Sequence, residues 1–177
     1  ENNAVDEVLY LTAYDTGTAF DRKGDNYGAR ISGWLLPDRA GDFAFFIASD
    51  DAGELYVSAD DTAENLDIVA QELSWSTAFE GGGDEEGTPF DSFVAGDRYY
   101  TELLYKEGGG GDGAKAAWRH WDDEESISVG KLQPIGGQYI GTYVDPSGSS
   151  VKITAQPQNL TAPLNATVSL SVSAEGS

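Results

Sequence analysis

The stretch "FAFFIASDDAGELYVS" (residues 43–58) decides the fold, because two apolar runs flank a pair of adjacent aspartates. The first run, residues 43–48, is apolar at every position, as expected of a strand buried on both faces in a sandwich interior. The second run, residues 55–57, follows almost at once. Asp50 and Asp51 therefore come at the end of a core strand, where two neighbouring carboxylates need an explanation.

The rest of the chain also predicts strands. Short runs rich in Val, Ile, Tyr, Phe and Thr are separated by turn signals, many of them among the 22 glycines, and no long helical period occurs. Residues 99–105 alternate most clearly, residues 5–14 also favour a strand, and residues 74–91 favour a long loop. The sequence therefore predicts an all-β fold, an antiparallel β-sandwich with long ligand-binding loops at one end.

The composition changes after Asp145. Residues 146–177 are rich in Ser, Thr and Pro and contain no aromatic residue, while Val168, Leu170 and Val172 alternate with polar residues. We expect a β-sandwich domain over 1–145, then a linker and the first strand or strands of an immunoglobulin-like repeat over 146–177. A mobile tail is the alternative. The chain begins with Glu1 and without a signal peptide, so we expect a piece of a larger protein.

The charge balance excludes some partners. The formal net charge is −21, from 31 acidic and 10 basic residues, which argues against nucleic acid and against anionic membranes. No apolar run approaches the roughly 18 residues of a membrane span, and the absence of cysteine excludes thiol catalysis and cysteine-type zinc sites. Such acidity favours divalent cations, although a halophilic source would explain it too.

Catalytic motifs are weak throughout. His120 is the only histidine, and no G-x-S-x-G motif accompanies it. The glycine run over 108–113 matches G-x-G-x-x-G but lacks the following helix of a dinucleotide-binding unit. Glu102 and Glu107 are available as a glycosidase-like pair, yet a chain with 31 acidic residues offers many such pairs. The sequence therefore predicts that the chain is not an enzyme.

The aspartate pair poses a geometric problem. Neighbouring side chains of a regular strand point to opposite faces, so Asp50 and Asp51 cannot hold one ion there. A sharp turn at the strand end would solve this, and so would a cis peptide bond, which swings both carboxylates to one side. We predict a cis bond between Asp50 and Asp51. An acidic hairpin turn with solvated carboxylates is the alternative.

A second element, "KEGGGGDG" (residues 106–113), follows the clearest strand. Its four consecutive glycines let the backbone fold tightly and turn carbonyl groups inward. Asp112 ends this loop and can add a third carboxylate. Calcium accepts about 6–8 oxygen ligands from such groups. A flexible hairpin tip is the alternative interpretation of the same residues.

Together, "NYGARISGWLLPDRAGDFAFFIASDDAGELYVSADD" (26–61) and "AGDRYYTELLYKEGGGGDGAKAAW" (95–118) resemble the protective-antigen fourteen ("PA fourteen") domain family. The resemblance covers roughly residues 26–144. It is nearest to versions in large secreted bacterial proteins, and relatives include bacterial adhesins and yeast flocculins. Many members are β-sandwich lectins that bind sugar through calcium, although some are not lectins. The chain departs from the family pattern at Gly113, which supplies no side chain to the loop.

The resemblance implies a calcium-dependent carbohydrate-binding (lectin) module of a large secreted or surface adhesin, monomeric as an isolated domain and located outside the cell or on its surface. Its partners would be glycans or polysaccharides, held by vicinal hydroxyls. The implied calcium ligands are Asp50, Asp51, Gly109, Gly110, Gly111 and Asp112, and the three aspartates would also contact sugar. Two alternatives are a structural calcium module and an accessory domain of a secreted glycosidase.

Tryptophan is the remaining candidate contact. Trp75 and Trp121 lie in predicted loops, where an indole ring could stack on a sugar face or simply pack. Trp34 and Trp118 lie in predicted strands, and we expect both in the core.

Overall fold

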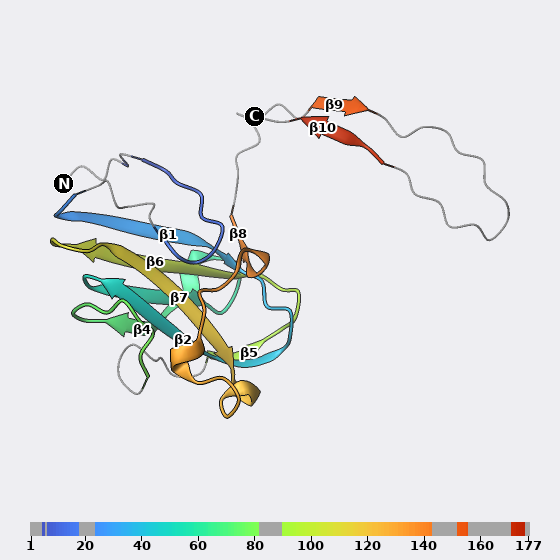
Figure 1. Cartoon of the computed structure of the whole chain (residues 1–177). Helices are drawn as coiled ribbons and strands as arrows, with labels where there is room; N and C mark the ends of the chain where they lie inside the picture. Colours follow the sequence, from blue (N-terminus) through green and yellow to red (C-terminus); the bar gives the residue numbers. More distant parts are fainter. Residues whose placement is uncertain are drawn as a thin grey trace. The chain divides into compact units, whose positions relative to one another are not determined.

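The computed structural model separates into two compact units, Glu1–Thr142 and Tyr143–Ser177, which are described one at a time (Figure 1). The residues that the structure describes are 5, 7–17, 24–81, 90–142, 152–155 and 171–175.

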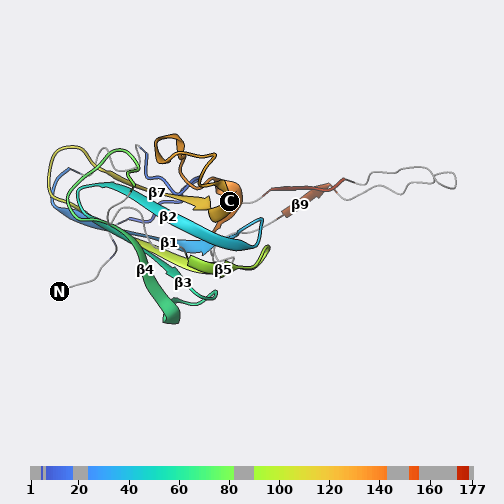
Figure 2. The ribbon, with the colours of Figure 1, turned by 90° about the horizontal axis from the view of Figure 1, so that it is seen from below.

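The first unit consists of two antiparallel sheets (Figures 1 and 2). The five-stranded sheet has the order β4-β3-β6-β1-β8 and the three-stranded sheet the order β5-β2-β7. The strands are β1 (Tyr27–Leu35), β2 (Gly41–Asp50), β3 (Gly53–Ser58), β4 (Leu66–Glu72), β5 (Phe90–Phe93), β6 (Tyr99–Glu107), β7 (Gly113–His120) and β8 (Ile140–Gly141). The predicted all-β sandwich is confirmed.

Helical structure in the described part is limited to single turns. These are the 3-10 helices η1 (Ala63–Asn65), η2 (Trp121–Asp123), η3 (Val129–Lys131) and η4 (Gly137–Tyr139). Within the same residues, no helix is long and apolar enough to cross a bilayer.

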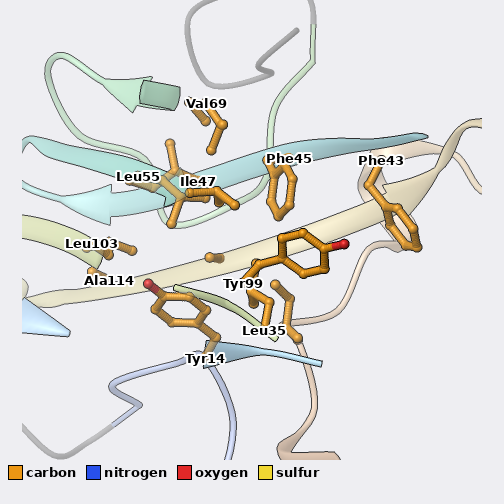
Figure 3. Packing of buried hydrophobic residues seen from close by; sticks show 14 of the residues in the cluster. Tyr14, Leu35, Phe43, Phe45, Ile47, Leu55, Val69, Tyr99, Leu103 and Ala114 are labelled. Carbon is orange, nitrogen blue, oxygen red and sulfur yellow. The ribbon is translucent and has the colours of Figure 1, made fainter. Parts of the chain in front are cut away.

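The main core lies between the two sheets (Figure 3). On β6 every second residue is buried, which is the pattern expected of a strand with one face in a core. Phe45 and Ile47 of β2 enter the same core opposite Leu55 and Leu103. Burial of these side chains from both sheets supplies the main driving force for stacking the sheets.

Strand β2 is buried on both faces, as its apolar sequence predicts. The side chains of Ala44, Phe46 and Ala48 point away from the main core into a smaller cluster. Phe79 and Leu132, which come from outside the sheets, cover that face. The strand that ends in the aspartate pair is therefore anchored from both sides.

Two strand predictions are wrong. Residues 5–14 form no strand in the described part, because Val5, Val8 and Tyr10 stay exposed and their spacing does not alternate. The end of that segment forms an isolated bridge from Ala13 to Gly136, and the Tyr14 amide donates to the Ile135 carbonyl. Conversely, β5 (Phe90–Phe93) begins within the last two residues of the stretch predicted as a loop over 74–91 and continues beyond it.

The two tryptophans predicted to lie in strands, Trp34 and Trp118, differ in whether they pack against the core. Trp118 packs partly buried against the main core, as predicted. Trp34 does not, because it pairs across strands with Tyr100, whose neighbours on β6 face the core. Its ring contacts the Tyr100 ring edge-on, and its Nε1 donates to the Asp61 carbonyl. Trp34 therefore belongs to the outer face of the five-stranded sheet.

The second unit contains an antiparallel pair, β9 (Lys152–Ala155) and β10 (Ser173–Glu175). Val168 and Leu170 lie outside the described residues, and Val172 is exposed just before β10. The immunoglobulin-like repeat stays a prediction.

Candidate cation and sugar site

The aspartate pair lies where β2 ends. The peptide bond between Asp50 and Asp51 is cis, which confirms the prediction made from the sequence. Asp50 is the last residue of β2 and pairs with Gly113, the first residue of β7. Because β6 and β7 are joined by residues 108–112, this pairing brings the glycine loop to the aspartates.

The glycine loop closes directly on the two carboxylates. The Gly108 amide donates a hydrogen bond to Asp51 Oδ2 over 2.8 Å. A Cβ atom on Gly108 would lie 2.6 Å from that same oxygen, and one on Gly111 would lie 2.8 Å from Asp50 Oδ2. A side chain at either position would therefore have to displace the aspartate carboxylate that it meets. Gly110 has φ of +117°, a conformation that favours glycine.

Two further carboxylates flank the loop. Asp112 Oδ2 accepts a hydrogen bond of 3.0 Å from the Tyr27 hydroxyl. Burial raises the pKa of Asp50, and the charges of Asp51 and then Asp112 raise it further. Asp25, which the sequence interpretation missed, lies with its Cγ 3.4 Å from the Cβ position of Gly109. Four acidic side chains thus surround one short loop.

The floor of the site is polar and buried. The Tyr105 hydroxyl contacts the Asp50 carbonyl at 2.6 Å and Glu107 Oε2 at 2.9 Å. Glu107 is 1% exposed, and its Oε1 has no hydrogen-bond partner among the described residues. A buried polar atom without a partner often indicates an ion or a water molecule at that place.

These donors fit a hard cation. Every candidate ligand atom is an oxygen, from carboxylates or from the carbonyls of residues 109–111, and calcium prefers such sets while zinc prefers nitrogen and sulfur. Within the described ranges, however, no group of three or more acidic or histidine side chains is close enough to hold a metal. Asp50, Asp51 and Asp112 are thus neighbours without forming a ready-made cage, and backbone oxygens would have to complete the set.

The two predicted sugar-stacking tryptophans lie far apart. Trp75 forms an isolated β-bridge with Asp50, and its side chain is 61% exposed. Trp121 begins η2, directly after His120, which pairs with Phe43 at the opposite end of β2. At 3.3 Å per residue, this places Trp121 more than about 20 Å from the aspartates. The structure brings Trp75 to the candidate site and leaves Trp121 out.

The remaining catalytic candidates are also separated. Glu102 and Glu107 are five residues apart on β6 and therefore point to opposite faces of the sheet. Glu102 lies on the outer face beside Arg30, whereas Glu107 is in the interior. His120 is buried, with Nε2 against the Ala40 carbonyl and Nδ1 accepting from the Asp122 amide. These residues do not assemble into one site.

The chain is similar in sequence to one part of an enzyme. No family model matches the chain, so the resemblance to the protective-antigen fourteen family stays a prediction. The chain is 34% identical over 140 residues to mouse N-acetyl-beta-glucosaminyl-glycoprotein 4-beta-N-acetylgalactosaminyltransferase 1. This similarity covers 75% of the chain but only 13% of the mouse protein.

Solved structures show weaker likenesses. An anti-sigma factor domain-containing protein from Clostridium clariflavum has a TM-score of 0.48 at 18% identity, covering 70% of this chain and 35% of that one. Two Candida glabrata domains have TM-scores of 0.44. One is the Epithelial Adhesin 6 A domain in complex with Galb1-3GlcNAc, which is 14% identical, with 67% of this chain and 52% of that chain covered. The other is the Epithelial Adhesin 9 A domain in complex with Galb1-4GlcNAc, which is 16% identical, with 67% of this chain and 57% of that chain covered. Likenesses at this level support no conclusion about function.

The mouse relative corrects one prediction. The sequence interpretation held that the chain is not an enzyme, whereas its 34% identical relative is a glycosyltransferase. The prediction failed because it considered only catalytic motifs inside these 177 residues. A module of this kind can be part of a longer chain that carries the chemistry elsewhere.

Proposed function

We propose that the unit Glu1–Thr142 is a calcium-dependent carbohydrate-binding module, with Asp50, Asp51 and the loop over 109–112 as its ligand site. One observation carries the proposal. The glycine loop lies directly against both carboxylates of the aspartate pair, so close that a side chain on Gly108 or Gly111 would displace the carboxylate beside it. Backbone oxygens of a loop so placed can share one cation with the two carboxylates.

The chain's own residues would divide the work of binding sugar. Asp50 and Asp51 would hold the cation with carbonyls of residues 109–111, and Asp112 would flank it. A bound calcium would supply open positions for two vicinal sugar hydroxyls. The same carboxylates can accept hydrogen bonds from those hydroxyls, since charged acceptors form the stronger hydrogen bonds. Trp75, exposed beside Asp50, offers a ring face to the sugar.

Two settings suit such a module. A secreted or surface adhesin would use it to bind glycans on other cells or surfaces. A carbohydrate-active enzyme would use it as an accessory module, and the mouse glycosyltransferase favours this second setting, because the similar region is a small part of that protein. A structural calcium module without sugar binding is the competing function.

A glycan array separates the lectin from the structural module. The labelled chain is applied once in calcium chloride and once in excess EDTA. The proposal predicts bound glycans with terminal vicinal diols in calcium and none in EDTA. Calcium-dependent melting without any bound glycan would instead support the structural module, and EDTA-resistant glycan binding would place the sugar at another site.

Replacing Gly111 with alanine should weaken calcium binding by about tenfold or more. The new methyl group would collide with Asp50 Oδ2, and overpacking of this kind typically costs about 1–3 kcal/mol. Gly130→Ala is the matched control, because nothing lies within 4 Å of its Cβ position. Calorimetric titration with calcium chloride measures both variants. Equal affinities for the two would show that the loop does not hold the cation.

Replacing Trp75 with alanine should weaken sugar binding by about threefold to tenfold, in line with one lost aromatic contact. Calcium affinity should not change, because the ring is exposed and holds no ligand of the cation. Trp121→Ala serves as the control, since that ring is similarly exposed at the other end of β7. A larger loss of sugar affinity in the Trp121 variant would indicate that the sugar binds away from the aspartates.

A further inference from the structure

Two tyrosines lie beneath the candidate site, and their hydroxyls contact both of its halves. Tyr27 begins β1 and Tyr105 lies near the end of β6, two adjacent strands of the five-stranded sheet (Figure 1). Their rings meet edge to face, with centroids 5.8 Å apart and an interplanar angle of 76°. Neither residue belongs to the ligand set argued above.

Tyr105 connects the aspartate pair to the end of the glycine loop. Its hydroxyl donates to the Asp50 carbonyl over 2.6 Å and accepts from the Gly113 amide over 2.9 Å. The Tyr105 hydroxyl oxygen therefore connects the end of β2, at Asp50, to the start of β7, at Gly113. Glu107 Oε2, at 2.9 Å, competes for the same hydroxyl proton.

Tyr27 orients the third carboxylate. Its hydroxyl donates to Asp112 Oδ2 over 3.0 Å, which leaves Oδ1 of the same carboxylate for another partner. Because one carboxylate oxygen is held by this hydrogen bond, the second oxygen points in a defined direction. Because Asp112 belongs to a glycine-rich loop, whose backbone has many accessible conformations, this bond restricts it where the loop sequence does not.

Both hydroxyls keep their protons near neutral pH and can therefore donate. Burial raises the pKa of Tyr27 to about 12, and its hydrogen bond to Asp112 also raises it. Burial likewise raises the pKa of Tyr105.

We propose that Tyr27 and Tyr105 are positioning residues of the cation site, which set the direction of Asp112 and the spacing between the aspartate pair and the glycine loop. The inference rests on the proposed function, because it assigns these hydroxyls to the same site. It adds that cation affinity depends on two side chains that do not touch the cation.

The test compares three tyrosine-to-phenylalanine variants of the full chain, each of which removes a single hydroxyl. Tyr27→Phe and Tyr105→Phe address the site, and Tyr14→Phe is the matched control. The Tyr14 hydroxyl is also buried and bonds Thr101 Oγ1 over 3.2 Å, without contact to the aspartates or the glycine loop. Calorimetric titration with calcium chloride gives each affinity, and melting in EDTA gives each stability.

We expect calcium affinity to fall about threefold to tenfold in Tyr27→Phe, the effect of one lost hydrogen bond, and at least as much in Tyr105→Phe, which loses the bonds to both Asp50 and Gly113. Affinity in Tyr14→Phe should stay within about twofold of the wild type by the same scale. Wild-type affinities in both site variants, or an equal loss in the control, would overturn the proposal. Loss of fold in either site variant would also overturn it, because the hydroxyls would then be structural. A wild-type chain without calcium binding would refute the proposed function itself.

Discussion

Replacing Asp51 with asparagine should reduce calcium affinity by about a hundredfold or more, since calcium depends on charged oxygen ligands. Asparagine keeps the shape of the side chain and one oxygen for the Gly108 amide, so only the charge is lost. The variant should therefore remain folded. In EDTA it should melt no lower than the wild type, because one of the charges that raise the pKa of Asp50 is gone.

Asp67→Asn is the matched control for this variant. Asp67 is exposed on β4 and pairs with Val57, whereas the end of β3 nearest the aspartates pairs with Glu72. The control makes the same change of net charge at a distance from the site. Calorimetric titrations of calcium into both variants give the comparison. Equal calcium affinity in the two variants would mean that the aspartate pair is an acidic turn and not a ligand set.

Removing calcium should lower the melting temperature by roughly 5–10 °C. A ligand that binds only the folded state adds about 2.7 kcal/mol at a hundred times its dissociation constant, and for a chain of this size each kcal/mol corresponds to a few degrees. Without the ion, burial and then the negative charges of Asp51 and Asp112 disfavour the ionised form of Asp50 and raise its pKa. Melting curves in calcium and in EDTA measure the difference.

This difference should shrink as the pH falls. Folding raises the pKa of Asp50 above its ordinary value of 3.8, so the folded chain without calcium binds a proton more tightly than the unfolded chain does. That contribution to stability is present at low pH and is lost as the pH rises through the raised pKa. At neutral pH, where this contribution is absent, bound calcium would stabilise the folded chain instead. Coincident melting curves in calcium and EDTA at pH 7 would argue against any such site, and the Asp51→Asn variant should show that coincidence.

The sequence predicted those parts of the site that are contiguous in the chain. Asp50 and Asp51 follow an apolar run that is recognisable without an alignment, and the parity of a strand predicts the conflict that the cis bond resolves. The glycine loop is equally local. Its placement against the aspartates follows from the pairing of Asp50 with Gly113, which the order of the strands alone does not fix.

The missed residues come from pairings between distant strands. Asp25 and Tyr27 reach the loop because Tyr27 pairs with Glu107, a register that a single sequence does not display. The distance of Trp121 from the aspartates could not be predicted for a related reason. A location in a loop predicts exposure, and Trp121 is indeed half exposed. The sequence does not show at which end of the sandwich that loop lies.

The exposed segment before Tyr14 shows a limit of periodicity. Val5, Val8 and Tyr10 have strand-forming side chains, yet they are exposed and belong to no strand of the described sheets. Strand propensity describes how a residue fits a half-buried pleated surface, and such a surface must be available. At the end of the segment, the Tyr14 backbone bonds to Ile135 and Ala116.

A crystal structure of the chain grown in calcium chloride and soaked with a vicinal-diol monosaccharide such as fucose, mannose or glucose tests the central claim most directly. Anomalous scattering identifies the cation. We predict one calcium ion between Asp50, Asp51 and the carbonyls of residues 109–111, with two neighbouring sugar hydroxyls completing its ligands. Sugar bound away from this loop, or ordered solvent in place of calcium between the two aspartates, would contradict the account.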